Sequence, residues 1–170
     1  MRLGGALVCV CALISGALAA VGEKKKQILT LHALCSALDL MQGELSFRGS
    51  SMEELLAFLL PRTSGLVSSF VQELSDGLSN LGEYDFSELW SMAADSCFAL
   101  SLRERELDEL KNLGAYLGRY DLETQVTQLR GCRSFLQETL AEAEKRFPVE
   151  RKLVLGLSVF VGLILTVLVI

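Results

Sequence analysis

Both ends of the chain are uncharged and strongly apolar, whereas the long stretch between them is not. Residues 3–22 and 153–170 contain no Asp, Glu, Lys or Arg. At about 1.5 Å of rise per residue, each stretch is close to the ~20 residues that a helix needs to cross a hydrocarbon core of about 30 Å. The sequence therefore predicts a transmembrane helix at 3–22, a separate domain at 23–150 and a second transmembrane helix at 153–170.

Positive charge beside the two apolar stretches predicts on which side of the membrane the domain lies. Basic residues within ~15–20 residues of a span tend to stay in the cytoplasm. We therefore expect a domain that faces the cytoplasm, with both termini on the opposite side. The basic residues that flank the spans are Lys24, Lys25 and Lys26 after the first, and Lys145, Arg146, Arg151 and Lys152 before the second.

A cleaved signal peptide is the alternative interpretation of the first apolar stretch. Ala17, Leu18 and Ala19 form an A-x-A cleavage site, and Met1–Arg2 can serve as a short positive region before it. Cleavage would export the domain and leave an exported helical surface protein with one C-terminal anchor. The stretch is longer than the 7–15 apolar residues typical of a signal peptide, and the lysines behind it favour retention as an anchor. Whether the bond between Ala19 and Ala20 is cut stays open.

The middle of the chain shows the apolar spacing of helices and no alternating pattern of strands. A first helix carries apolar residues from Ile28 to Leu45, can run on from the first span, and is interrupted at Gly49–Ser50. The fold class predicted is therefore all-α: a small bundle of about six helices, flanked by the N- and C-terminal transmembrane helices.

Turn and cap residues set the borders of the other helices. Three Ser/Asp-x-x-Glu boxes predict helix starts after Ser51, Asp85 and Ser101. Pro61 should end the short second helix, and Gly82 should end a third helix over about 64–80. Gly118 should end the fifth helix in a left-handed turn. Asp121 should then start a sixth helix that runs to Phe147, just before Pro148.

Aromatic residues of the domain divide into expected core and expected surface. We expect Trp90 and three phenylalanines in the core, and three other aromatic residues as candidate surface contacts. The expected core phenylalanines are Phe58, Phe70 and Phe86, and the candidate contacts are Phe47, Tyr84 and Tyr116.

The composition argues against catalysis and against nucleic acid. All 21 acidic residues lie between Glu23 and Lys152, and an acidic domain does not attract phosphate backbones. The one histidine, His32, forms with Cys35 a pair of ligands, whereas a structural zinc site needs four and a catalytic site three. Cysteines without a C-x-x-C motif suggest reduced thiols. We expect no catalytic residues, no cofactor, no metal and no enzymatic activity.

The spacing Gly114-x-x-x-Gly118 allows two interpretations. It can seat another helix closely, as it does in membrane helices, or it can mark a tight turn at a helix end. The position near a predicted helix end favours the turn.

The order of several short motifs resembles that of the stage III sporulation protein AB family of endospore-forming bacteria. The first helix reads LHALCSALDLMQGELSF and is followed by SSMEELL; SELW, LKNLGAYLGRYDLETQVTQL and the apolar tail LVLGLSVFVGLILTVLVI follow in the family order. The SSMEELL segment departs from the Thr-Pro-Leu type of helix start usual in the family. The segment GAYLGRYD is also weakly similar to F-type platform proteins of type II secretion and type IV pilus systems.

The resemblance implies a role in assembly. It implies a non-catalytic platform subunit of a secretion-like complex, placed in the mother-cell membrane around the forespore and linking the two cells. The implied partners are the bilayer, the secretion-like ATPase of the same sporulation operon and multi-span membrane subunits, with no nucleic acid. We place the partner-binding patch where the family pattern is densest, at Gly114, Leu117, Gly118, Arg119, Asp121 and Gln125.

Overall fold

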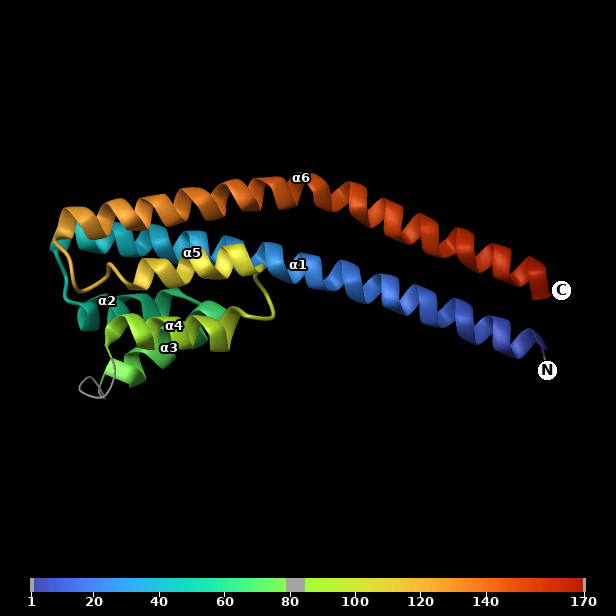
Figure 1. Cartoon of the computed structure of the whole chain (residues 1–170), viewed down its shortest axis with the longest axis horizontal. Coiled ribbons are helices and arrows are strands. Elements are labelled where there is room, and N and C mark those ends of the chain that lie inside the picture. The colour runs from blue at the N-terminus through green and yellow to red at the C-terminus, as the bar shows by residue number, and fades with distance from the viewer. Residues whose placement is uncertain (1, 79–84, 170) are drawn as a thin grey trace. The chain divides into compact units, whose positions relative to one another are not determined.

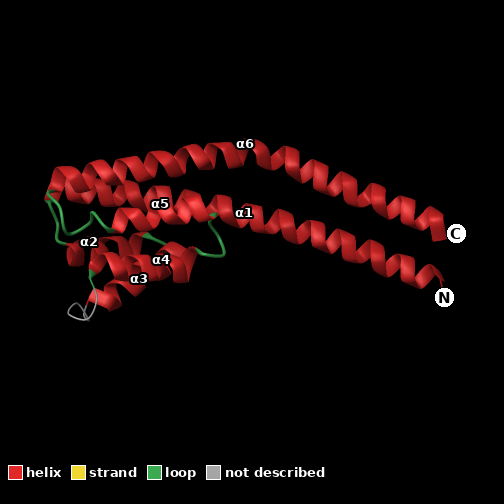
Figure 2. Cartoon of the chain, in the orientation of Figure 1, coloured by secondary structure: helices red, strands yellow, loops and turns green. Residues whose placement is uncertain are grey.

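The computed structural model describes residues 2–78 and 85–169, and every regular element in these ranges is helical (Figure 2). The expected all-α class with six α-helices is confirmed for this part of the chain. The elements are α1 (Arg2–Arg48), α2 (Met52–Leu59), the 3₁₀ helix η1 (Leu60–Arg62), α3 (Gly65–Leu78), α4 (Phe86–Phe98), α5 (Glu104–Gly114) and α6 (Leu122–Val169).

The chain divides into two compact units, and α1 and α6 each run through both. The terminal unit comprises Met1–Ile28 and Ala141–Ile170, and the helical unit comprises Leu29–Leu140. Within the terminal unit, the first part of α1 and the last part of α6 run side by side with both chain ends at one end, and Lys24 forms an ion pair with Glu150 (Figure 1). The first helix thus continues from the predicted span without a break.

Among the residues that the structure describes, no helix is both long enough and apolar enough to cross a membrane. Many side chains of the two predicted spans lie outside the described residues, in the ranges 2–14 and 162–169 and at positions 17, 155, 158 and 159.

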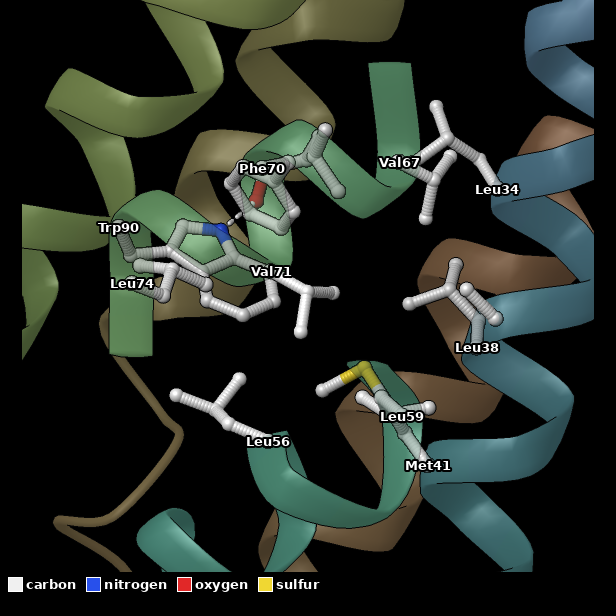
Figure 3. A pocket seen from close by; sticks show the side chains of 12 residues that line it. Leu34, Leu38, Met41, Leu56, Leu59, Val67, Phe70, Val71, Leu74 and Trp90 are labelled. Atoms are coloured by element: carbon white, nitrogen blue, oxygen red, sulfur yellow. Dashed lines mark hydrogen bonds between the residues drawn. The ribbon is translucent and has the colours of Figure 1, made fainter. Parts of the chain in front are cut away.

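The core of the helical unit forms on one stripe of α1. Its five apolar residues are at most 4% exposed. Three of them, Leu34, Leu38 and Met41, face buried residues of α2, α3 and α4 (Figure 3). Burying an aliphatic side chain of this size contributes roughly 1.5–3 kcal/mol, so the stripe is the main attachment of α1 to the short helices. The stripe consists of Leu31, Leu34, Leu38, Met41 and Leu45.

Two predicted helix caps are confirmed. The Ser51 hydroxyl accepts a hydrogen bond from the Glu54 amide at 3.3 Å, and the Glu54 carboxylate accepts one from the Ser51 amide at 3.1 Å. Asp85 and Glu88 cap α4 reciprocally in the same way. Each box satisfies two amides that the first turn of a helix otherwise leaves without partners.

The predicted start of the fifth helix at Ser101 is wrong. The amides of Ser101 and Leu102 both donate to the carbonyl of Phe98, so these residues prolong the end of α4. α5 begins two residues later, and the Glu106 carboxylate accepts a hydrogen bond from the Arg103 amide at 2.9 Å. The Ser-x-x-Glu motif is present at Ser101, but the Ser101 amide already donates to the Phe98 carbonyl in the turn that ends α4.

The predicted end of the sixth helix at Phe147 is also wrong, because α6 continues through Pro148 to Val169. A proline inside a helix removes one hydrogen bond and costs about 3 kcal/mol. This loss can kink a helix without ending it. α2 ends at Leu59, directly before the 3₁₀ turn that contains Pro61, as expected. α3 ends at Leu78, and the predicted end near residue 80 and Gly82 lie outside the described residues.

The aromatic residues largely follow the expectation. Trp90 and Phe70 are buried, with ring centroids 4.8 Å apart in an edge-to-face arrangement, whereas Phe58 and Phe86 are half-buried. Phe47 is 91% exposed. The other two candidate contacts are half-buried (Tyr116) and outside the described residues (Tyr84).

Candidate partner-binding site

The six predicted partner-binding residues lie together at the turn between α5 and α6, but burial divides them. Gly114, Leu117 and Gln125 are buried, whereas Gly118, Arg119 and Asp121 are exposed. The buried residues can shape the turn, and the exposed ones are available to another protein.

Gly114 allows α5 to pack closely on α4. The indole of Trp90 is 1% exposed and donates a hydrogen bond to the Leu110 carbonyl at 2.7 Å (Figure 3). A Cβ atom at Gly114 would lie 2.4 Å from Cδ1 of this indole, closer than real contacts allow. Gly114 is therefore a close-packing glycine, and the turn interpretation of the Gly114/Gly118 spacing holds for Gly118 alone.

Gln125 closes the turn from inside. The backbone of Gly118 has φ 72°, a left-handed conformation that glycine adopts without a Cβ clash. The Gln125 side-chain oxygen accepts a hydrogen bond from the Gly118 amide at 3.2 Å, and its nitrogen donates to the Tyr120 carbonyl at 2.6 Å. Leu117, directly before Gly118, is buried in the core. The turn is therefore held in one shape.

Asp121 caps α6. Its two carboxylate oxygens accept hydrogen bonds from the Thr124 hydroxyl at 2.7 Å and the Thr124 amide at 3.0 Å. These hydrogen bonds favour the charged carboxylate and hold the pKa of Asp121 below its ordinary value near 3.8.

Exposed aromatic and basic side chains surround this turn. The Arg119 side chain is 72% exposed, with one guanidinium nitrogen 4.0 Å from an Asp85 carboxylate oxygen. Tyr120 is half exposed and its ring lies 5.5 Å from that of Tyr116. Leu122, the first residue of α6, is exposed as well.

The last turn of α1 lies at the same end of the helical unit. α1 and α6 run antiparallel there, with Arg133 Nε 2.6 Å from Asp39 Oδ1. Phe47 lies eight residues after Asp39 in α1, and Gln125 lies eight residues before Arg133 in α6. Because the helices are antiparallel and have the same rise per residue, Phe47 and Gln125 lie at the same height along the pair. We name four exposed side chains and one half-buried side chain at this end the distal surface; the exposed ones are Phe47, Arg119, Tyr120 and Leu122, and the half-buried one is Tyr116.

The spacing of the tyrosines was the signal that could have found more of this surface. Tyr116 and Tyr120 are four residues apart around Gly118, where the chain leaves a helix and exposes successive side chains. Tyrosine and arginine are enriched among residues that dominate binding energy at protein interfaces.

The basic residues predicted to flank the membrane all lie in the terminal unit and are exposed. The ion pair between Lys24 and Glu150 brings the group after the first apolar stretch beside the group before the second. Within α6, Arg146 lies 3.8 Å from Glu142. The complete set is Lys24, Lys25, Lys26, Lys145, Arg146, Arg151 and Lys152.

The pocket in the helical unit is the hydrophobic core itself. Its lining side chains are apolar apart from the Trp90 N–H, which the Leu110 carbonyl already accepts (Figure 3). Ligand sites need a few polar groups that orient the ligand. The pocket is therefore a site of packing between core side chains and lacks the polar groups that a ligand site needs.

The described residues offer little metal or thiol chemistry. No group of three or more His, Cys, Asp or Glu side chains gathers among them. His32 is exposed whereas Cys35, one turn away, is buried. Burial raises the pKa of the Cys132 thiol to about 12 and that of Cys97 to about 11, and Glu73 adds to the shift at Cys97. Such thiols are poor nucleophiles at neutral pH.

Comparison with known proteins points to one family. A family model described as "Stage III sporulation protein AB" matches residues 2–170. The chain is 26% identical over 151 residues to stage III sporulation protein AB of Bacillus subtilis (strain 168), covering 86% of this chain and 84% of that protein. A solved structure of a stage III sporulation protein AB has the same fold, with a TM-score of 0.64 and 20% identity, covering 72% of this chain and 96% of the other.

Replacing Gly114 tests the close packing of α5 on α4. Because the new methyl group would meet the Trp90 indole, Gly114→Ala should lower the free energy of unfolding by about 1–3 kcal/mol. Gly131→Ala is the matched control, since Gly131 lies within α6 and a Cβ there meets nothing within 4 Å. It should be neutral or stabilise by up to about 1 kcal/mol. Denaturant unfolding measures both, and equal stability of the two variants would contradict the packing.

Removing the Asp121 carboxylate tests the cap through its pH dependence. Because the folded-state pKa is lowered, the carboxylate stabilises the fold above its ordinary pKa, and this contribution is lost as the pH falls through the lowered value. Asp121→Ala should therefore be less stable than the wild type at pH 7, and the difference should shrink below about pH 4. Thr124→Val, which removes the hydroxyl donor, should weaken the same pH dependence. A constant difference across the pH range would refute the assignment.

Proposed function

The chain belongs to the stage III sporulation protein AB family, and on that premise we propose that it is a non-catalytic membrane platform subunit of a secretion-like sporulation channel complex. In this proposal the complex links the mother cell and the forespore. The helical unit docks the cytoplasmic secretion-like ATPase of the same operon.

In the proposed arrangement, residues 3–22 and 153–170 are two transmembrane helices in the mother-cell membrane around the forespore. The helical unit faces the cytoplasm and both termini lie on the other side. Two features support this arrangement: the lack of charge in both stretches, and the ion pair that joins Lys24 to Glu150 beside them. The exposed lysines and arginines would each contribute about 1 kcal/mol of attraction to anionic headgroups.

One stripe of α6 supports contact with lipid or with multi-span membrane subunits. The described side chains of Leu153, Leu157 and Phe160 are more than 60% exposed and follow at helical spacing. Such an apolar stripe is costly in water and favourable in hydrocarbon.

The docking proposal rests on the position of the distal surface. α1 enters the helical unit at Leu29, α6 leaves it at Leu140, and the distal surface lies at the opposite end. The helix from Leu29 to Arg48 separates these ends by roughly 30 Å. The distal surface is therefore the end of the helical unit that lies away from both of its chain connections to the proposed spans.

The division of the turn residues supports a preformed docking site. Gly114, Leu117 and Gln125 hold the α5–α6 turn from inside, so Arg119, Asp121 and their exposed neighbours are presented in one conformation. A partner that binds a rigid surface loses less conformational entropy on binding.

A charge reversal on the distal surface tests the docking. Arg119→Glu should reduce capture of the purified ATPase by the full-length protein in detergent by about tenfold or more, as expected for a central arginine. Arg119 contributes little to folding, because its ion pair with Asp85 is exposed and 4.0 Å long. Helicity and melting temperature should therefore be unchanged.

Arg130→Glu is the matched control, since it makes the same charge change at an exposed position of α6 away from the turn. It should leave capture intact. Full capture by a well-folded Arg119→Glu variant, or equal loss in both variants, would overturn the docking site.

A further inference from the structure

The turn between α4 and α5 holds a fully exposed leucine. Leu100 is 99% exposed, the highest value among the large apolar residues described, and Ala99 beside it is exposed as well. On either side the chain is buried at Phe98 and Leu102. The turn therefore leaves the core, presents an apolar tip and returns within a few residues.

The backbone keeps this tip in place. The Phe98 carbonyl accepts hydrogen bonds from the Ser101 amide at 2.8 Å and the Leu102 amide at 2.9 Å, and Ser101 itself is buried. Leu100 is thus held outward by a tight turn that is anchored on both sides. A single exposed leucine is ordinary on a protein surface, so its position decides what it can do.

The α4–α5 turn lies toward the end of the helical unit where α1 enters and α6 leaves. α5 runs antiparallel to α6, with the Cys132 thiol 3.9 Å from the Glu109 carbonyl and the Arg105 guanidinium 5.2 Å above the Phe135 ring. Moving back along α5 from Glu109 therefore corresponds to moving on along α6 toward Leu140. In Figure 1 the loop that joins α4 to α5 lies at the end of the helical unit where α1 enters.

Basic and apolar side chains accompany Leu100 at this end. Arg103 and Arg105 lie three and five residues after it, and both are exposed, with exposed Glu104 between them. Arg103 Nε lies 3.9 Å from the buried carboxylate of Glu106, and the Arg103 side chain is still 63% exposed. Leu29, where α1 enters the unit, is 59% exposed. An apolar tip next to arginines is the combination that binds the surface of an anionic bilayer.

We propose that the α4–α5 turn is a third membrane contact, in which Leu100 enters the headgroup layer and Arg103 meets lipid phosphates. The proposal rests on the two-span anchoring proposed above, because the chain joins the two proposed spans to this end of the unit, at Leu29 and Leu140. Lys145, the first basic residue of the second flank, follows Leu140 by little more than one turn of helix. The contact would hold the helical unit in one orientation, with its distal surface facing the cytoplasm.

The test uses tryptophan fluorescence of the full-length protein in vesicles that contain an anionic lipid. The lipids carry bromine, which quenches tryptophan on contact, near the headgroup end of their acyl chains. The native Trp90 is buried in the protein core, so the wild type is the blank. The added emission of Leu100→Trp should be quenched several-fold more than that of Phe47→Trp, which reports the opposite end of the unit.

Leu157→Trp in the predicted second span separates the two proposals. If Leu157→Trp is quenched but Leu100→Trp is quenched no more than Phe47→Trp, the third contact is overturned and the anchoring stays intact. Failure to quench at position 157 would overturn the anchoring itself. Circular dichroism checks that each variant is folded.

The electrostatic part is tested in the same vesicles. Quenching of Leu100→Trp should fall when the anionic lipid is replaced by a zwitterionic one and when Arg103 is changed to Gln. If the quenching of Leu100→Trp is unchanged by the zwitterionic lipid and by Arg103→Gln, the role of Arg103 is contradicted.

Discussion

The antiparallel pairing of α1 with α6 is the constraint on which the rest of the helical unit depends. The apolar stripe of α1 from Leu31 to Leu45 forms one wall of the core, and the ion pair between Asp39 and Arg133 shows which positions of the two helices lie side by side. Because the helices are antiparallel, the chain enters and leaves the unit at one end. The turns that follow α1 and precede α6 must then lie at the other end.

The short helices complete this frame through one close contact. Trp90 of α4 packs on the backbone at Gly114 of α5, and its indole N–H is satisfied by the Leu110 carbonyl. Beyond this contact, the hydrogen bonds of the Gln125 side chain to Gly118 and Tyr120 hold the turn that leads into α6. The exposed side chains of the distal surface are positioned by groups that no partner can reach.

Much of the fold could be predicted from local patterns. The stripe of α1, the caps at Ser51 and Asp85 and the left-handed turn at Gly118 each follow from residues close in the sequence. The α5 cap could not be predicted in this way, because the Ser101 amide already donates to the Phe98 carbonyl at the end of α4. The continuation of α6 could not be predicted either, because the helix goes on past Pro148 without the hydrogen bond that proline cannot donate.

The candidate site was located by the family resemblance but not resolved by it. A family pattern marks Gly114 and Leu117 as readily as Asp121, although the first two are buried and Asp121 is exposed. The reason for Gly114 is a tryptophan more than 20 residues earlier, which local spacing cannot reveal. The exposure of Tyr120 and Leu122 depends on where α6 enters the core, and that too is a tertiary property.

We propose that two membrane spans, one before Leu29 and one after Leu140, hold the helical unit on the cytoplasmic side of a membrane. The most direct measurement is labelling of Ser46→Cys, an exposed position of α1, with a membrane-impermeant maleimide. The protein is made in non-sporulating cells, and the wild type gives the background of its native thiols. The account predicts added labelling in inside-out vesicles and none in intact cells. Added labelling in intact cells would show that the unit is exported, and would contradict the account.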